Sequence, residues 1–282
     1  MGNIIPKDKI GIVGYGYVGK GTEILVSNPI NDADIVVYDK DPSLCKPEGK
    51  CFDDLHGCMV VFVCVPTPMN EDGSCHTDIV SSVVCRLKGH GIDPWRIIIR
   101  STVPVGTSEA LGVNFMPEFL AERTWKEDAE NCKDYVLGVD SDEEWRIHDE
   151  LRKIVPWMKK FHIFTTKEAE LIKYVRNTFL ATKVSFFNEI AAFCEARNID
   201  YEMLRKGIGM DERVGINHTQ VPGPDGKKGF GGTCFPKDAN SLVYQMEQSG
   251  LTSYVLEAAI SRNESVDRPE EDWKEDRGRV VV

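Results

Sequence analysis

The chain lacks any apolar run near the ~20 residues that a membrane-spanning helix needs. One of its longest apolar runs, Met59–Val65, has only the length of a buried strand. It also lacks an excess of positive charge, since 34 Lys and Arg face 45 Asp and Glu and the net charge is −11. This balance argues against nucleic acid or an anionic membrane as a partner. The first residues contain no apolar stretch and cleavage site of a signal peptide, so we expect a cytoplasmic protein.

Cysteine is present without the pattern of a disulfide framework or a zinc site. The nine cysteines are an odd number, in a chain that is too long for a small disulfide-stabilised domain. Cys45, Cys51 and Cys58 are not at zinc-finger spacing, so no metal is predicted. We expect most of the nine to be small buried hydrophobic side chains.

Apolar strands alternate with helices over the first part of the chain. We predict strands at residues 9–14, 34–39, 59–65, 96–100, 135–139 and 161–164. We predict helices between them at residues 18–27, 78–88 and 143–154. Strands that are apolar on both faces are typical of a parallel sheet covered on both sides. The fold class is therefore α/β, a Rossmann-type doubly wound parallel sheet.

The pattern changes at Lys167. Residues 167–197 contain no Gly or Pro over 31 positions and carry apolar side chains near helical spacing, which predicts one helix of about 45 Å. Shorter helices are expected at residues 201–207, 236–248 and 251–262. We therefore predict a Rossmann domain at 1–165, an all-α domain built on the long helix at 166–262, and a charged tail or linker at 263–282.

The segment GYGYVG at residues 14–19 fits the dinucleotide fingerprint G-x-G-x-x-G. In this motif Gly14 permits a tight turn, Gly16 lets the backbone approach a pyrophosphate, and Gly19 lets the following helix pack close to the strand. The motif follows the first strand and opens a helix whose N-terminus attracts phosphate. This context favours a dinucleotide site over a purely structural turn.

Asp39 ends the second predicted strand, 20 residues after Gly19. A carboxylate at this place accepts hydrogen bonds from a ribose 2′-hydroxyl and repels a 2′-phosphate, so NAD is favoured over NADP. Lys40 beside it softens that preference. The domain at 1–165 is therefore predicted to bind NAD.

The stretch GGTCFPKD at residues 231–238 indicates a nucleophile. Cys234 stands just before a predicted helix with Pro236 in its first turn, and both the helix N-terminus and Lys237 favour a thiolate. Asp238 follows about one helical turn later, where it can orient a water molecule or a charged partner. An arbitrary cysteine is more often a buried hydrophobic residue, but these neighbours favour a catalytic role.

Two further pairs are weaker signals. Lys173 and Asn177 lie four residues apart on the long helix and share a face, which makes a polar site for a sugar oxygen a hypothesis beside the alternative of a solvated charge. Glu118 and Glu122, in the segment PEFLAE, are also four residues apart, and surface carboxylates are mostly just solvated.

These motifs together resemble the UDP-glucose/GDP-mannose dehydrogenase family. The matching segments are GIVGYGYVG (11–19), VPTP (65–68), STVPVGT (101–107), PEFLAE (117–122), ELIKYVRNTFLATKVSFFNEI (170–190), DERVG (211–215) and VPGPDGKKGFGGTCFPKD (221–238). The likeness covers about residues 9–262. It implies that a nucleotide-sugar C6 alcohol is oxidised to a carboxylate by two NAD in succession, with UDP-glucose to UDP-glucuronate as the expected reaction.

The resemblance also implies a role for each matching residue. Cys234 would capture the aldehyde as a thiohemiacetal, from which hydride loss gives a thioester. Lys173 would stabilise the oxyanion, with Asn177 helping. Asp238 and Thr102 would organise the proton-transferring water.

Further roles implied by the resemblance concern binding and hydrolysis. Glu118 would be the base for thioester hydrolysis, and Arg213 would reach the substrate across a dimer. The implied substrate contacts are Glu118, Phe119, Leu120, Lys173, Asn177, Arg213, Gly231 and Lys237. The implied cofactor contacts are Gly14, Gly16, Tyr17, Val18, Gly19, Asp39, Lys40, Thr67, Thr102 and Glu122.

The family resemblance leaves alternatives open. Family members continue into a second Rossmann-like domain that holds much of the nucleotide, and this chain is expected to lack it. We expect a homodimer through the long helix, and a uronic acid for polysaccharide biosynthesis as the usual product. UDP-glucose, GDP-mannose and UDP-N-acetylhexosamines all stay open as substrates. The other functions considered are a two-electron β-hydroxyacid dehydrogenase, which needs no nucleophilic cysteine, and a catalytically incomplete NAD-binding dimeric module.

Overall fold

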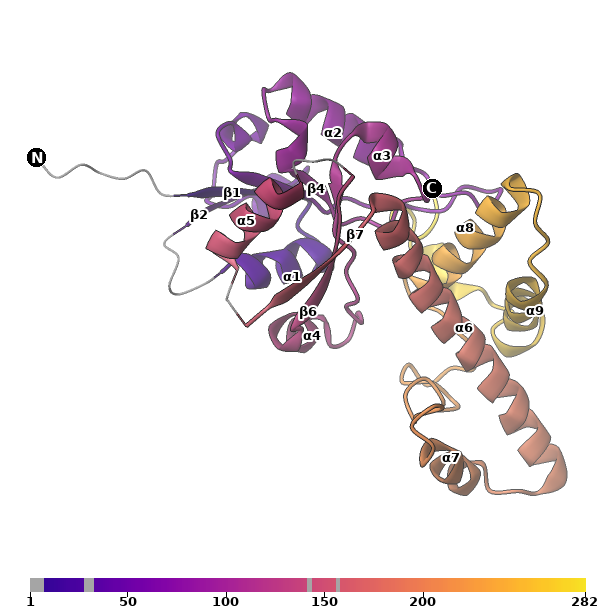
Figure 1. Cartoon of the computed structure of the whole chain (residues 1–282). Coiled ribbons are helices and arrows are strands. Elements are labelled where there is room, and N and C mark those ends of the chain that lie inside the picture. The colour runs from indigo at the N-terminus through magenta and orange to yellow at the C-terminus, as the bar shows by residue number, and fades with distance from the viewer. Residues whose placement is uncertain (1–7, 28–32, 141–143, 156–157) are drawn as a thin grey trace, which may run out of the picture. The chain divides into compact units, whose positions relative to one another are not determined.

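One seven-stranded sheet, in the order β2-β1-β3-β4-β5-β6-β7, organises the first part of the chain (Figure 1). The computed structural model describes residues 8–27, 33–140, 144–155 and 158–282. The strands are β1 Lys9–Val13, β2 Asp34–Tyr38, β3 Val60–Val63, β4 Ile97–Ile99, β5 Asn114–Phe115, β6 Asp134–Gly138 and β7 Lys160–Phe164. All neighbours are parallel except β5 and β6, which are antiparallel. The predicted α/β class is confirmed, and β5 is an additional strand.

The chain divides into two compact units, each described by itself. The first comprises Met1–Thr67 and His76–Lys173, and the second comprises Pro68–Cys75 and Tyr174–Val282. The helices of the first unit are α1 Tyr17–Val26, α2 Asp78–Gly89, α3 Thr107–Leu111, α4 Trp125–Asn131 and α5 Glu144–Ile154, with 3₁₀ turns at Pro42–Leu44, Phe52–Leu55 and Pro94–Arg96. Glu143, the expected first residue of α5, lies outside the described residues.

The sheet of the first unit is buried on both faces. Side chains of α1 and α5, such as Leu25 and Leu151, pack on one face of the sheet. Side chains of α2, such as Val84 and Leu87, pack on the other. Every residue of β3 is fully buried, which explains why this strand reads as a continuous apolar run.

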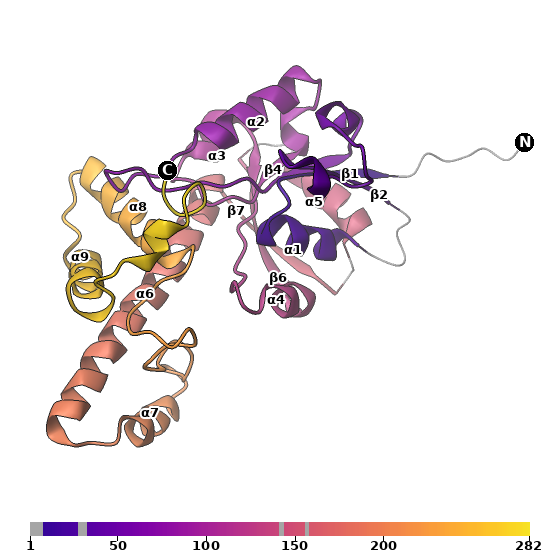
Figure 2. The ribbon, with the colours of Figure 1, turned by 180° about the vertical axis from the view of Figure 1, so that it is seen from behind.

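The second unit is helical and is built on α6, Thr166–Arg197, whose first turns belong to the first unit (Figure 2). The predicted long helix is confirmed to within one residue at its start. The remaining helices are α7 Tyr201–Gly209, α8 Phe235–Gln248 and α9 Tyr254–Arg262, followed by a π-helical turn at Asn263–Asp267 and a 3₁₀ turn at Asp272–Glu275. The Asp200 carboxylate caps α7 by accepting a hydrogen bond from the backbone nitrogen of Met203.

Residues 263–282, expected to be a linker or a frayed end, are folded against the rest of the second unit. Trp273 is 4% exposed and Val280 is fully buried. The backbone nitrogen of Met69 donates to the carbonyl of Val280 at 2.7 Å, and that of Val282 donates to the carbonyl of Met69 at 3.0 Å. Two apolar side chains of this charged segment, Trp273 and Val280, therefore help to anchor it.

Three predictions made from the sequence concern membrane-spanning helices, metal sites and the burial of the cysteines. Within the part of the chain that the structure describes, no helix combines the length and the apolar character needed to cross a membrane. The same residues contain no group of three or more His, Cys, Asp or Glu side chains that could hold a metal ion. The expectation that most cysteines are buried is wrong, because only four of the nine are: Cys45, Cys58, Cys64 and Cys194.

Candidate active site

The glycine-rich turn of the first unit connects β1 to α1. Gly14 has φ +90°, and a Cβ there would lie 2.6 Å from the carbonyl oxygen of Cys64. A Cβ on Gly19 would lie 2.1 Å from the carbonyl oxygen of Gly14, so the helix could not approach the strand. A Cβ on Gly16 meets no described atom within 4 Å, so this face of the turn is open to a ligand. These three positions fit a dinucleotide pyrophosphate.

Asp39, directly after β2, is tied to the same turn. One oxygen of its carboxylate accepts from the backbone nitrogen of Tyr15 at 2.7 Å, and the other accepts from that of Asp41 at 2.9 Å. Each oxygen keeps lone-pair capacity for a ribose hydroxyl. The backbone bonds therefore hold the carboxylate in place, and the geometry fits NAD.

The other predicted cofactor residues follow strand ends of the first unit or open α1. Tyr17 and Val18 form the first turn of α1 and are half-buried, whereas Lys40 and Glu122 are exposed. Thr67, after β3, and Thr102, after β4, are both buried. A parallel sheet places such residues along its carboxyl edge, where ligands of open α/β sheets bind.

The two glycines allow a direct test of this site. We expect Gly16→Ala to leave the melting temperature within about 2 °C of the unsubstituted chain and to weaken NAD binding about tenfold, because the added methyl meets ligand and not protein. Gly19→Ala should lower the melting temperature by several degrees, because its methyl meets backbone. Thermal scans and calorimetric titration with NAD measure both effects. Equal destabilisation by the two substitutions would contradict this assignment.

Glu118 and Lys173 form a buried ion pair in the first unit. The Nζ of Lys173 lies 2.8 Å from Oε1 of Glu118 and donates to the Glu118 carbonyl at the same distance. Both side chains are at most 6% exposed. Burial alone would raise the pKa of Glu118, but the Lys173 ammonium, the backbone nitrogen of Leu120 and the Arg100 charge outweigh it and hold that pKa below its usual value.

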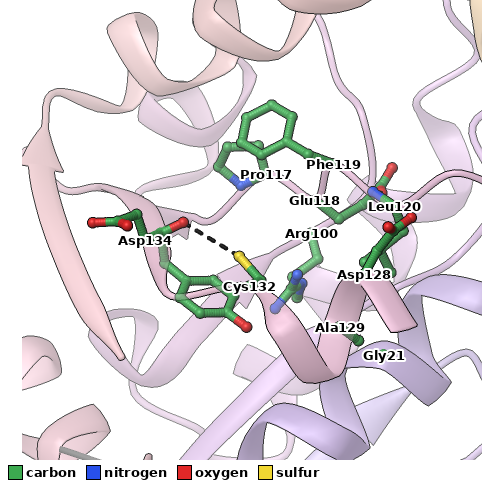
Figure 3. A pocket seen from close by; sticks show the side chains of 11 residues that line it. Gly21, Arg100, Pro117, Glu118, Phe119, Leu120, Asp128, Ala129, Cys132 and Asp134 are labelled. Atoms are coloured by element: carbon green, nitrogen blue, oxygen red, sulfur yellow. Dashed lines mark hydrogen bonds between the residues drawn. The ribbon is translucent and has the colours of Figure 1, made fainter. Parts of the chain in front are cut away.

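A pocket opens beside this pair, and Figure 3 shows Arg100, Pro117, Glu118 and Phe119 in its wall. Its lining includes Glu118, Phe119 and Leu120, three of the predicted substrate contacts. Arg100, which follows β4, is 3% exposed and adds a second positive charge near Glu118. Arg100 is not among the predicted site residues. A charged residue at the end of the apolar strand RIIIR was the signal for it.

Glu170, on the first turns of α6, is likewise absent from the predicted site residues. This fully buried carboxylate accepts from the backbone nitrogens of Gly106 at 2.6 Å and Ser108 at 2.8 Å. Burial raises its pKa. The contacts fix the loop 101–107, which carries Thr102, to the start of α6, where Lys173 lies within one turn of Glu170.

The second unit gathers the other predicted catalytic residues at the start of α8. Cys234 is the N-cap residue of this helix and is half-buried. The Asp238 carboxylate, 1% exposed, accepts from Nδ2 of Asn177 at 2.6 Å and lies 2.5 Å from Nζ of Lys237. Burial would lower the pKa of Lys237, but attraction to Asp238, Cys234 and Cys75 raises it well above its usual value. A cation is thereby held beside the thiol.

Two predicted substrate residues of the second unit, Arg213 and Gly231, lie outside the Lys237–Asp238–Asn177 cluster. Arg213 follows α7, is exposed, and forms a bidentate pair with Asp211 at 2.5 and 2.9 Å. Gly231 lies three residues before Cys234, and its Cα faces the guanidinium of Arg268. The structure does not bring Arg213 to Cys234 within the single chain.

Two family models match the chain over both units. Residues 50–155 match the NAD binding domain of the UDP-glucose/GDP-mannose dehydrogenase family, and residues 167–265 match its central domain. The chain belongs to the UDP-glucose/GDP-mannose dehydrogenase family. The predicted resemblance is confirmed, and NAD is the cofactor of the family's N-terminal domain.

Individual members of the family show how much of the chain the likeness covers. A UDP-glucose 6-dehydrogenase of Pseudomonas aeruginosa is 34% identical over an alignment of 225 residues, and the match covers 72% of this chain and 48% of that protein. The chain spans about half the length of the curated relatives it matches.

Solved structures agree on the fold. A UDP-glucose dehydrogenase from Pyrobaculum islandicum superposes with a TM-score of 0.80 at 24% identity, covering 94% of this chain and 69% of that one. A 3-hydroxyisobutyrate dehydrogenase from Mycobacterium tuberculosis superposes with a TM-score of 0.70 at 15% identity, covering 98% and 97%. At these identities both show the fold alone.

Proposed function

We propose that the protein oxidises the C6 alcohol of a nucleotide sugar to a carboxylate with NAD, and that UDP-glucose is converted to UDP-glucuronate. The observation that carries the proposal is the arrangement at the start of α8, where half-buried Cys234 occupies the N-cap position beside the Lys237–Asp238–Asn177 cluster. The curated relatives named UDP-glucose 6-dehydrogenase support this substrate.

The chemistry requires two oxidations and one hydrolysis. Bound NAD supplies the chemistry of hydride acceptance, once for each oxidation. In the first oxidation the alcohol loses a proton and a hydride and becomes an aldehyde. The Cys234 thiolate then adds to the aldehyde carbon and forms a C–S bond, and the alkoxide of the resulting thiohemiacetal loses a second hydride to become a thioester. Water breaks the C–S bond, which releases the carboxylate and restores the thiol.

In this mechanism each polar or charged side chain has a separate role. The Lys173 ammonium, held by Glu118, stabilises negative charge on the reacting oxygen. Glu118 is ionised in the pair and accepts a proton from the hydrolytic water. Asp238 and Thr102 organise the water that carries the proton of the alcohol, and Asn177 keeps the Asp238 carboxylate oriented.

The two alternatives are less well supported. A two-electron β-hydroxyacid dehydrogenase has the same fold, as the Mycobacterium tuberculosis structure illustrates, but at 15% identity only. A two-electron oxidation does not use the Cys234 thiol at the start of α8. A catalytically incomplete NAD-binding module would not need the buried Glu118–Lys173 pair, since an unneeded buried ion pair is seldom better than apolar packing.

The experiment that tests the proposal measures product and cofactor together. We expect two NADH for each UDP-glucuronate when the purified chain is given UDP-glucose and NAD, with the product identified by mass. One NADH per product would support the two-electron alternative. NAD binding without turnover of UDP-glucose, GDP-mannose or a UDP-N-acetylhexosamine would support the incomplete module.

We further propose a homodimer through α6. Within the second unit, α6 exposes large apolar side chains at spacings of four and seven residues: Val175, Phe179, Phe186 and Phe193. These side chains are at least half exposed in the single chain, and such a stripe on a helix marks an interaction surface. Light scattering at micromolar concentration should give twice the mass of 31.7 kDa, and Phe179→Asp with Phe186→Asp should give the monomer mass. Ile79→Asp on α2 is the control, and a monomeric unsubstituted chain would refute the dimer.

A further inference from the structure

The backbone just before Cys234 lies against the segment 263–272. The side chain of Asn263, 1% exposed, accepts from the backbone nitrogen of Phe230 at 2.8 Å and donates to the carbonyl of the same residue at 2.9 Å. The backbone nitrogen of Gly229 donates to Oδ1 of Asn188 on α6 at 3.1 Å. Two asparagine side chains therefore bind three backbone groups of this stretch.

Two glycines in this stretch allow the close approach. A Cβ on Gly229, whose φ is +71°, would lie 2.3 Å from Oδ1 of Asn263. A Cβ on Gly231 would lie 2.4 to 2.7 Å from the guanidinium atoms of Arg268. The glycine-rich sequence GFGG is thus explained at Gly229 and Gly231 by the side chains behind it.

Arg268 is itself held rigidly. Its guanidinium donates to both carboxylate oxygens of Asp272 at 2.6 and 2.8 Å and to Asp225 at 2.7 Å. Its side chain is 5% exposed, and its backbone nitrogen donates to the carbonyl of Asn263 at 2.7 Å. Bidentate arginine pairs of this kind fix a planar group in one orientation.

We propose that Asn263 and Arg268 are positioning residues that set the place of the Cys234 thiol by fixing the backbone at residues 229–231. The proposal rests on the proposed role of Cys234 as nucleophile. Arg268 lies beyond the segments that match the family models. The contacts described above join both side chains to residues 229–231, so in this proposal both act through that backbone.

The test adds a methyl group between the backbone of residues 229–231 and the Arg268 guanidinium. Gly231→Ala places a Cβ against the Arg268 guanidinium, and we expect the alkylation of Cys234 by iodoacetamide to slow about tenfold, because a displacement near 1 Å has effects of that size or larger. The rate is followed on the Cys234 peptide by mass spectrometry. In turnover, kcat should fall by a similar factor while KM for NAD stays within twofold.

A second variant separates positioning from general damage. Arg268→Met removes the guanidinium and leaves room for the methyl group, so Gly231→Ala should slow alkylation less than threefold when added to Arg268→Met. Lys227→Met is the matched control, since the Lys227 ammonium also pairs with Asp272 and its other ion pair is with Glu270. Its alkylation rate should stay within twofold of the unsubstituted chain.

Three results would overturn the proposal: an unchanged alkylation rate in folded Gly231→Ala, an equal loss in both backgrounds, or a loss in the Lys227→Met control. Where Arg268→Met does not fold, Asn263→Asp takes its place, because the new carboxylate faces the Phe230 carbonyl and should also slow alkylation tenfold. An unchanged rate in folded Asn263→Asp would equally overturn it. Alkylation needs no substrate, so these outcomes are distinct from a failure of the proposed reaction.

Discussion

Cys234→Ala is expected to reduce UDP-glucuronate formation at least about 10³-fold, the scale seen when a catalytic nucleophile is removed. The aldehyde has no group to capture it in this variant, so the second hydride cannot leave from a covalent adduct. At most one NADH should form for each active site, from the first oxidation. Rapid mixing with UDP-glucose and NAD, followed by NADH absorbance and mass analysis, measures both quantities.

A matched substitution separates the nucleophile from cysteine chemistry in general. Cys85 is exposed on α2, and Cys85→Ala should leave turnover within twofold. Steady production of UDP-glucuronate by Cys234→Ala at the original rate would remove the thioester from the mechanism. Single-oxidation turnover in both variants would favour the β-hydroxyacid alternative.

The elements that were predicted from the sequence share one property, which is that local constraints determine them. The long helix follows from 31 positions without Gly or Pro, and the turn at residues 14–19 follows from backbone sterics. By contrast, β5 has two residues and α3 has five, which is too short for any periodicity to appear. The folded segment 263–282 pairs through Val280 and Val282 with Met69, more than 200 positions earlier.

In the candidate site, too, contacts between side chains that are distant in the sequence could not be predicted from local spacing. Lys173 and Asn177 share a face of α6, and this spacing suggested one polar site. The structure gives them different partners, since Lys173 binds Glu118, 55 residues away, and Asn177 binds Asp238, 61 residues away. The resemblance to a family supplied a role for each residue. No sequence pattern shows that the proposed oxyanion cation and the proposed base form one buried pair.

That pair makes Lys173→Met the substitution with the largest expected effect on stability. Removing one partner of a buried ion pair leaves an uncompensated charge and costs about 3–5 kcal/mol of unfolding free energy. Near neutral pH we expect a loss of this size in urea unfolding. A loss below about 1 kcal/mol would show that solvent reaches Glu118 and that the pair is not buried as the structure has it.

The pH dependence of that loss identifies Glu118 as its source. In the unsubstituted chain the pKa of Glu118 lies below its ordinary value of 4.5, so the unfolded state binds the proton more tightly and stability rises with pH up to about 4.5. In Lys173→Met burial is no longer opposed by the ammonium and raises that pKa above 4.5, so stability should fall as pH rises from 4.5 through the new pKa. The positive slope of unfolding free energy against pH below 4.5 is therefore replaced, in Lys173→Met, by a negative slope between 4.5 and the new pKa. Adding Glu118→Gln removes the titrating group, and the negative slope should disappear; if it persists in the double variant, another carboxylate is responsible.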